Sequence, residues 1–246
     1  MCRLLGYVSQ EKQSFNQAVG SDFAEFVTLS SVHCDGWGVA TIDHDQSVAH
    51  VSRAPEAANS SKDFSKTIES SVSDGALLHL RWATAGLPVS ENNTHPFAYK
   101  DVSFIHNGAT YPPAALEPFI SKELLSLIQG DTDSERYFFA VLTAIDELGL
   151  VEGVRKAVKA ISANCDFTSI NCMLLTPEHM VAVCEFNEGD STEWTVDSHY
   201  ELRYSAADDA IRVASTGWGK DHWNCLPNHS ILLIDRSDLT FEVLPL

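Results

Sequence analysis

The order in which segment types follow one another constrains the fold of this chain most. Short apolar runs rich in β-branched residues fill the first half, helical patterns fill the middle, and apolar runs return in the last third. The strand-like runs cover 2–9, 38–42, 47–53, 75–82, 102–106, 171–175, 180–186, 200–205, 211–215, 230–235 and 240–244. Strands, then helices, then strands predict a layered α+β domain with mostly antiparallel sheets.

Helical patterns cover 22–29, 62–72, 117–128, 132–148 and 151–161. Thr132 followed three residues later by Glu135 has the spacing of a capping box, so we expect a helix to begin there. The apolar pattern that follows is expected to stop at Gly149. The chain has 246 residues and carries no repeat, low-complexity segment or linker, which predicts a single domain over 1–246.

Composition excludes several classes of function. Hydrophobic residues make up 44% of the chain, which excludes a disordered protein. Asp and Glu total 34 against 16 Lys and Arg, so the formal charge of −18 disfavours nucleic acid and anionic membrane surfaces as partners. The six Cys include no CxxC pair, and neither a signal peptide nor a membrane span is recognisable, so we expect reduced thiols and a cytoplasmic location.

Cys2 is the first candidate catalytic residue. Removal of Met1 would leave a thiol and a free α-amine on the same residue. An α-amine titrates near ~7.7–8, so it can take the thiol proton and produce a nucleophile. The alternative is that Cys2 is a small buried residue of the first strand, and the residue alone leaves both open.

Three further positions carry possible chemistry. Arg81 ends an apolar strand, where it suits either a substrate carboxylate or an internal Asp or Glu. Asn107 and Gly108 offer either a two-donor oxyanion hole or a hairpin turn. Asp133 either only starts a helix or holds a substrate ammonium at the sheet edge.

Two other patterns are less specific. The glycines of the segment 34–38 permit either a turn into a strand or a loop that shapes a pocket. His222, Cys225 and His229 stand at metal-like spacings, but no fourth ligand lies near them in the sequence, so we expect no metal. No other segment indicates a cofactor.

In combination, these segments resemble the class II, N-terminal-nucleophile glutamine amidotransferases, and the length resembles their stand-alone members. The resemblance covers most of the chain from Cys2 to about Leu148. The segments that match in order and approximate spacing are Met1-Cys2, Arg81-Trp82-Ala83-Thr84, Asn93-Thr94-His95-Pro96-Phe97, His106-Asn107-Gly108 and Thr132-Asp133-Ser134-Glu135.

The resemblance implies a four-layer αββα sandwich of the N-terminal-nucleophile hydrolase type. It implies Cys2 as the nucleophile and an oxyanion hole made by Asn107 and Gly108. It implies that Arg81 binds the α-carboxylate of the substrate and that Asp133 binds its α-ammonium group. It also implies that Thr84 and the backbone of Trp82 line the glutamyl pocket. Ala85 stands where many members carry His, which predicts a less strict preference for glutamine.

The implied reaction is hydrolysis of the γ-amide of glutamine or of a γ-glutamyl compound through a thioester on Cys2. Two alternatives stay open: a glutaminase subunit that delivers ammonia to a separate synthase, and a catalytically silent binding or regulatory module. Presence of Cys2, Asn107 and Asp133 disfavours the silent module. The expected partners are a small glutamine-like substrate and, in the first alternative, the synthase.

Overall fold

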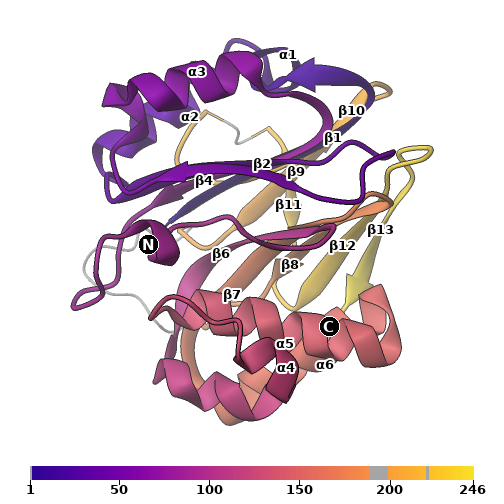
Figure 1. Ribbon diagram of the computed structural model, residues 1–246. Coiled ribbons are helices and arrows are strands. Elements are labelled where there is room, and N and C mark those ends of the chain that lie inside the picture. Colours follow the sequence, from indigo (N-terminus) through magenta and orange to yellow (C-terminus); the bar gives the residue numbers. More distant parts are fainter. Residues whose placement is uncertain (1, 189–198, 220–221) are drawn as a thin grey trace.

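Two antiparallel sheets lie face to face at the centre of the structure, and helices cover the outer face of each sheet (Figure 1). The structure is a computed structural model that describes residues 2–188, 199–219 and 222–246. The layers therefore follow the order helix, sheet, sheet, helix. This confirms the predicted four-layer αββα sandwich of the N-terminal-nucleophile hydrolase type.

The seven-stranded sheet contains both the beginning of the chain and part of its last third. Its spatial order is β11 (Asn224–Leu226), β9 (Leu202–Ala206), β10 (Ala210–Ser215), β1 (Arg3–Ser14), β4 (Val72–Arg81), β2 (Gly36–Thr41) and β3 (His50–Ala54). Helices α1 (Phe15–Val19), α2 (Phe23–Thr28) and α3 (Lys62–Ser70) cover its outer face (Figure 1).

The six-stranded sheet is covered by the two longest helices. Its spatial order is β13 (Phe241–Pro245), β12 (Ser230–Asp235), β8 (His179–Cys184), β7 (Asp166–Leu175), β6 (Val102–Tyr111) and β5 (Phe97–Tyr99). Helices α5 (Asp133–Leu148) and α6 (Leu150–Asn164) pack on its outer face, and the short α4 (Lys122–Leu125) precedes them (Figure 1). The 3-10 helices are η1 (Leu29–Ser31), η2 (Ala58–Ser60), η3 (Glu91–Asn93) and the longer η4 (Pro113–Phe119).

Three apolar cores separate the four layers, because successive side chains of a strand point to opposite faces. In β1, Leu5 and Tyr7 join the core under α1–α3, whereas Leu4 and Val8 join the core between the sheets. A third core lies between the six-stranded sheet and α5 and α6. Since both faces of the central strands are buried, they appear in the sequence as continuous apolar runs.

Two local predictions need correction, and three short elements were missed. The segment 117–128 is not one helix, because Pro118 lies within η4 and only one turn of α4 follows. The box at 132–135 is half formed: Thr132 Oγ1 accepts the Glu135 N–H, but the Glu135 carboxylate accepts the N–H groups of Gln129 and Gly130. The strands β5 and β11 and the helix α1 were not predicted.

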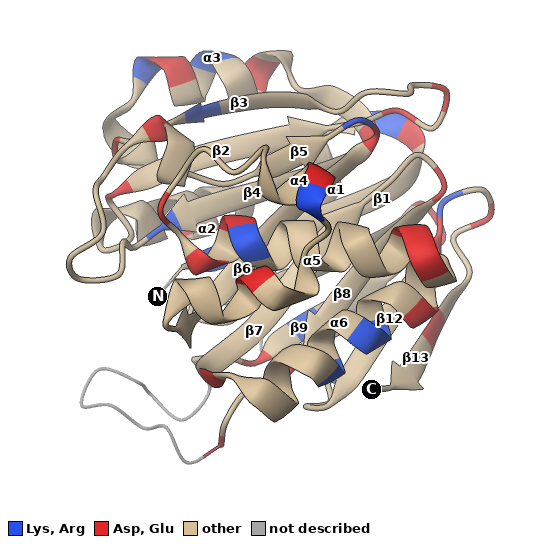
Figure 2. Ribbon diagram, turned by 60° about the horizontal axis from the view of Figure 1, so that its bottom comes forward, with Lys and Arg blue, Asp and Glu red and all other residues tan. Residues whose placement is uncertain are grey.

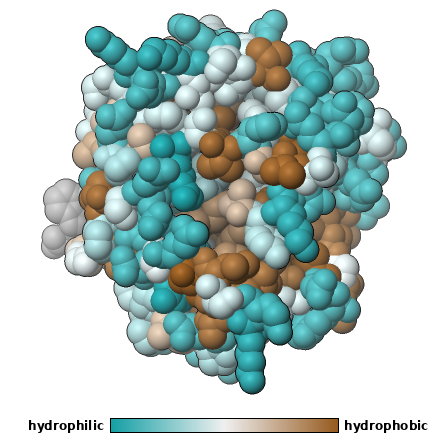
Figure 3. Space-filling model, viewed as in Figure 1, coloured by the Kyte–Doolittle hydropathy of each residue, from teal (hydrophilic) through white to brown (hydrophobic). Residues whose placement is uncertain are grey.

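Charge and hydropathy differ across the surface. Acidic residues are distributed over helices, strands and loops and do not form one acidic segment (Figure 2). On the face seen in Figure 1, apolar side chains gather around a hollow in the middle of the molecule (Figure 3). None of the helices formed by the described residues is long and apolar enough to cross a membrane.

Candidate active site

Cys2 and Asn107 meet where the start of β1 approaches β6, a strand of the other sheet. Cys2 directly precedes β1, and its backbone nitrogen donates a hydrogen bond to Asn107 Oδ1 at 2.7 Å. Asn107 lies inside β6, opposite Asn171 of β7, so the hairpin-turn alternative for 107–108 is wrong. Met1, whose removal would leave Cys2 with a free α-amine, lies outside the described residues.

A cavity of about 270 Å³ opens beside Cys2. Six of the seven predicted site residues line it: Cys2, Arg81, Trp82, Thr84, Gly108 and Asp133. The seventh, Asn107, is buried and does not line the cavity, but it bonds to Cys2. The Cys2 thiol lies 3.7 Å from the Trp82 carbonyl oxygen. The structure therefore brings all the predicted site residues together.

Arg81 ends β4 and offers an unpaired cation to the cavity. Its Nη2 donates to the Pro88 carbonyl at 3.2 Å, while its buried Nη1 has no hydrogen-bond partner among the described residues. Burial lowers the pKa of the guanidinium, and the nearby Cys2 and Asp35 act in the opposite direction. No Asp or Glu of the described ranges forms an ion pair with Arg81, so the structure does not support the internal-carboxylate alternative.

Asp133 is the first residue of α5, and its carboxylate is buried. Its Oδ2 accepts the Thr110 N–H at 2.7 Å, which fixes the side chain against β6. Burial raises the pKa of this carboxyl, and His106 and the Thr110 N–H partly offset the shift. Burying a charged carboxylate that has no cation beside it costs free energy while no ligand is bound. A ligand with an ammonium group would offset that cost, so the Asp133 carboxylate is suited to such a ligand.

Gly108 and Asn107 are the two residues that the sequence predicts as the oxyanion hole, and they lie side by side on β6. A Cβ on Gly108 would lie 1.7 Å from the carbonyl oxygen of Ser169 on β7, so only glycine fits at this position. The buried Asn107 Nδ2 has no hydrogen-bond partner among the described residues. A buried donor without a partner is rare in folded proteins and is available to a ligand.

The segment 34–38 holds the loop that follows β4. The Asp35 carboxylate accepts the Ala83 N–H at 2.8 Å, and the Asp35 N–H donates to the Arg81 carbonyl at 3.0 Å. These two bonds bracket Trp82, whose carbonyl faces the Cys2 thiol. Of the two sequence interpretations, the pocket-shaping loop therefore describes the Asp35 end of the segment.

A cluster of three buried histidines, two of which line the cavity, was not recognised as a unit from the sequence. The rings of His79 and His95 stack with centroids 4.1 Å apart, and His79 Nε2 lies 3.1 Å from the His106 carbonyl oxygen. Burial lowers the pKa of His79 to about 3 and that of His95 well below its usual range. Two of the quoted motifs contained a sequence signal, because 93–97 includes His95 and 106–108 includes His106.

The described residues contain no group of three or more His, Cys, Asp or Glu arranged to hold a metal ion. Of the three residues with metal-like spacings, His229 bonds through Nδ1 to Glu185 Oε2 at 2.7 Å. Cys225 lies on β11 with its thiol 3.7 Å from the Leu226 carbonyl oxygen. These contacts are structural and do not form a metal site.

Comparison with known proteins decides the family. The family model described as "Glutamine amidotransferases class-II" matches residues 1–223. The chain belongs to the class-II glutamine amidotransferase family. It is 34% identical over 123 residues to the probable glutamine amidotransferase DUG3 of Saccharomyces cerevisiae, a match that covers 47% of this chain and 34% of that protein.

Solved structures of class-II amidotransferases share the fold. A glutamine aminotransferase class-II domain protein from Silicibacter pomeroyi superposes with a TM-score of 0.70 at 18% identity, with 99% of each chain covered. Glutamine phosphoribosylpyrophosphate amidotransferase from Bacillus subtilis gives 0.66 at 15% identity, covering 99% of this chain and 49% of that chain. This class-II family member thus spans about a third of its yeast relative and about half of the Bacillus chain.

Proposed function

We propose that this protein hydrolyses the γ-amide of glutamine or of a γ-glutamyl compound through a thioester on Cys2. The convergence of the Cys2 thiol, the Arg81 guanidinium and the Asp133 carboxylate on one cavity supports this proposal most directly. Arg81 is suited to the α-carboxylate of a glutamyl group and Asp133 to its α-ammonium group. Cys2 is then the nucleophile for the γ-carbonyl at the other end of the substrate. Two charged anchors hold the carbonyl in position, which is a large part of the rate enhancement in such reactions.

The proposed reaction needs only residues of this chain and water. After removal of Met1, the Cys2 α-amine takes the thiol proton, and the thiolate attacks the γ-carbonyl carbon. Asn107 Nδ2 and the Gly108 N–H donate to the oxyanion, each worth roughly 3 kcal/mol of barrier. The α-ammonium then gives its proton to the leaving amine as the C–N bond breaks. Water hydrolyses the thioester, which releases glutamate and regenerates the thiol.

The two alternatives differ in what happens to the bound glutamine. A glutaminase subunit would deliver ammonia to a separate synthase and would hydrolyse glutamine slowly when alone. A silent module would bind glutamine without turnover. The unpartnered Asn107 Nδ2, placed beside Cys2, favours catalysis over simple binding. The free hydrolase is our preferred reading, and the synthase partner and the cytoplasmic location stay predictions.

Intact mass spectrometry with a diazoketone analogue of glutamine tests the proposal. We expect the wild-type chain to lack Met1 and to gain one covalent adduct, and Cys2→Ala to gain none. Cys34→Ala is the matched control, because Cys34 is an exposed free thiol outside the cavity and its loss should leave the adduct unchanged. Full hydrolysis by Cys2→Ala, or by a chain that retains Met1, would contradict the mechanism.

Substrate comparison separates the alternatives. The rates with glutamine, a γ-glutamyl peptide and a γ-glutamyl thioether are measured with Cys2→Ala as the blank. Turnover of the peptide or the thioether supports a free hydrolase. Slow turnover of glutamine, with no turnover of the other two compounds, supports the glutaminase subunit. Binding of glutamine in calorimetry without any turnover supports the silent module.

A further inference from the structure

A second cavity lies on the opposite side of the wall that closes the active-site cavity. Its volume is about 570 Å³. His95 and Ser134 line the active-site cavity, whereas their neighbours Pro96 and Glu135 line the second one. The second cavity lies between two edge strands, β3 of one sheet and β5 of the other, and the segment 126–129 before α5. A volume of this size suits a small molecule.

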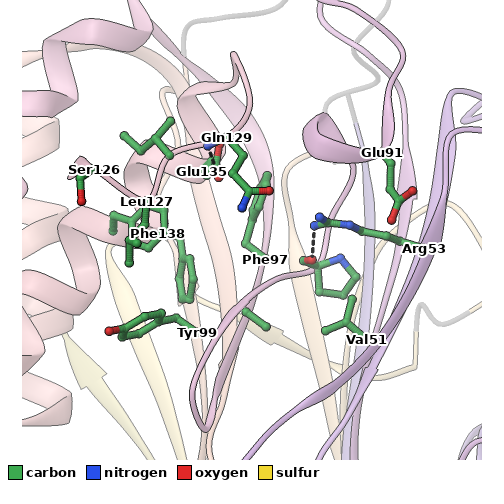
Figure 4. A pocket seen from close by; sticks show the side chains of 14 residues that line it. Val51, Arg53, Glu91, Phe97, Tyr99, Ser126, Leu127, Gln129, Glu135 and Phe138 are labelled. Carbon is green, nitrogen blue, oxygen red and sulfur yellow. Dashed lines mark hydrogen bonds between the residues drawn. The ribbon is translucent and has the colours of Figure 1, made fainter. Parts of the chain in front are cut away.

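One side of the second cavity carries the Arg53 guanidinium, which forms no ion pair with a carboxylate of the described residues. Arg53 Nη1 donates to the carbonyls of Thr94 and Pro96 at 3.0 and 2.9 Å, and the bond to Pro96 is drawn in Figure 4. None of the ion pairs among described residues includes Arg53. Burial lowers the pKa of this guanidinium, and Glu91 and Glu135 act in the opposite direction.

A carboxylate stands beside that cation. Figure 4 shows the Glu91 side chain next to the Arg53 side chain at the same side of the cavity. The carboxylate of Glu135 is occupied, since it accepts the N–H groups of Gln129 and Gly130 at 3.0 and 2.7 Å. Glu91 is therefore the cavity carboxylate that remains available to a ligand.

The facing side of the cavity is apolar. Phe138, Leu127 and Tyr99 lie across the cavity from Arg53, with Phe97 and the Gln129 side chain between the two sides (Figure 4). Leu127 is 40% exposed, although contact with an apolar group would stabilise it at about 25 cal/mol per Å². The cavity thus has a charged end and an apolar end.

We propose that this cavity binds a free α-amino acid with a large apolar side chain. Its carboxylate would bind Arg53, its ammonium would bind Glu91, and its side chain would pack against Phe97, Phe138 and Leu127. A planar guanidinium suits a carboxylate because it offers parallel donors. A ligand with a single charge would meet repulsion from one of the two adjacent protein charges, whereas a zwitterion satisfies both. The ligand site is separate from the active-site cavity.

Isothermal titration calorimetry of the full chain with L-phenylalanine tests this inference. We expect saturable binding at one site, with a Kd below about 10 mM. N-acetyl-L-phenylalanine lacks the ammonium and L-phenylalaninamide lacks the carboxylate, so each should bind about tenfold more weakly or worse. Glycine, which has no apolar side chain, should give no measurable binding.

Variants locate the site without disturbing the fold. Glu91→Gln removes the ammonium partner, and Leu127→Glu places a charge at the apolar end, so each should weaken L-phenylalanine binding about tenfold or more. Glu69→Gln and Val48→Glu make the same kinds of change at exposed positions outside the cavity and should leave binding unchanged. Asp133→Asn alters the active-site cavity and should also leave it unchanged.

Three results would overturn the inference. The first is the absence of saturable L-phenylalanine binding. The second is equal binding of the acetylated ligand, because the ammonium would then have no partner. The third is loss of binding in Asp133→Asn with no loss in Glu91→Gln, which would place the ligand in the active-site cavity. Since binding is measured without turnover, none of these results depends on the hydrolysis proposed above.

Discussion

The backbone nitrogen of Cys2 and the side-chain oxygen of Asn107 are 2.7 Å apart, although 105 positions separate these residues in the sequence. Cys2 leads into β1 of the seven-stranded sheet, and Asn107 belongs to β6 of the six-stranded sheet. A second bridge crosses the same gap, from His79 of β4 to the His106 carbonyl. The candidate site therefore depends on how the two sheets pack against each other.

Asn107→Ala tests the oxyanion role. The substitution removes both the acceptor for the Cys2 nitrogen and the unpartnered Nδ2 donor. We expect kcat for glutamine hydrolysis to fall roughly 100- to 1,000-fold, with little change in KM, because the charged anchors remain. Steady-state kinetics measures both constants. Asn59→Ala, an exposed control, should match the wild type, and a kcat for Asn107→Ala near the wild-type value would refute the assignment.

Gly108→Ala tests whether the close approach of β6 and β7 requires glycine. The added Cβ would meet the Ser169 carbonyl oxygen at 1.7 Å, and a backbone atom of a paired strand cannot move aside easily. We expect the free energy of unfolding in urea to fall by about 3 kcal/mol or more. At Gly86, φ is +88° and an added Cβ would have no atom of a non-neighbouring residue within 4 Å. The free energy of unfolding of Gly86→Ala should therefore fall by only about 1 kcal/mol. Equal losses would show that the contact is not decisive.

The features that could be predicted from the sequence are those that depend on neighbouring residues, such as the two ends of helix α5. Helix α5 begins at Asp133 because the Thr132 side chain accepts the Glu135 N–H, and it ends before Gly149, whose φ is +80°. All the signals for this helix lie within or beside its own segment. Motif order also predicted six residues that line the cavity, and Asn107, which lies next to it. The three-residue strands β5 and β11 were missed because they are too short to display a period of two.

Long-range packing explains what the sequence could not predict. The stack of His79 on His95 joins two segments whose relative position is set by the two sheets. Burial, not sequence context, lowers the pKa of these histidines. The second cavity likewise appears only where the edge strands β3 and β5 approach the same loop.

The buried histidines predict how stability depends on pH. Because the pKa of His79 is about 3 in the folded protein and near ~6.5 in the unfolded chain, the unfolded state binds the proton first. The stability is therefore complete above pH ~6.5 and declines as the pH falls toward ~3. For this group alone, the loss at pH ~5 is about 2 kcal/mol.

His79→Gln isolates that contribution, since glutamine keeps a donor for the His106 carbonyl but does not titrate in this range. Between pH ~7.5 and ~5, the variant should lose about 2 kcal/mol less free energy of unfolding than the wild type. Urea unfolding at both pH values gives the comparison. His50→Gln, at an exposed position of β3, should keep the wild-type difference. An unchanged difference in His79→Gln would mean that His79 is protonated in the folded state.

Asp133→Asn predicts opposite effects on binding and on stability. Asparagine can still accept the Thr110 N–H but cannot pair with a substrate ammonium, so KM for glutamine should rise roughly 10- to 100-fold while kcat changes little. Burial raises the pKa of Asp133, which means that the charged form destabilises the folded state at neutral pH. The variant should therefore unfold at a higher urea concentration than the wild type at pH ~7, and this gain should shrink as the pH falls through the raised pKa and the wild-type carboxyl becomes protonated. Asp146→Asn, exposed on the same helix, should change neither quantity, and a variant with higher KM but lower stability would show that Asp133 acts mainly as a structural residue of α5.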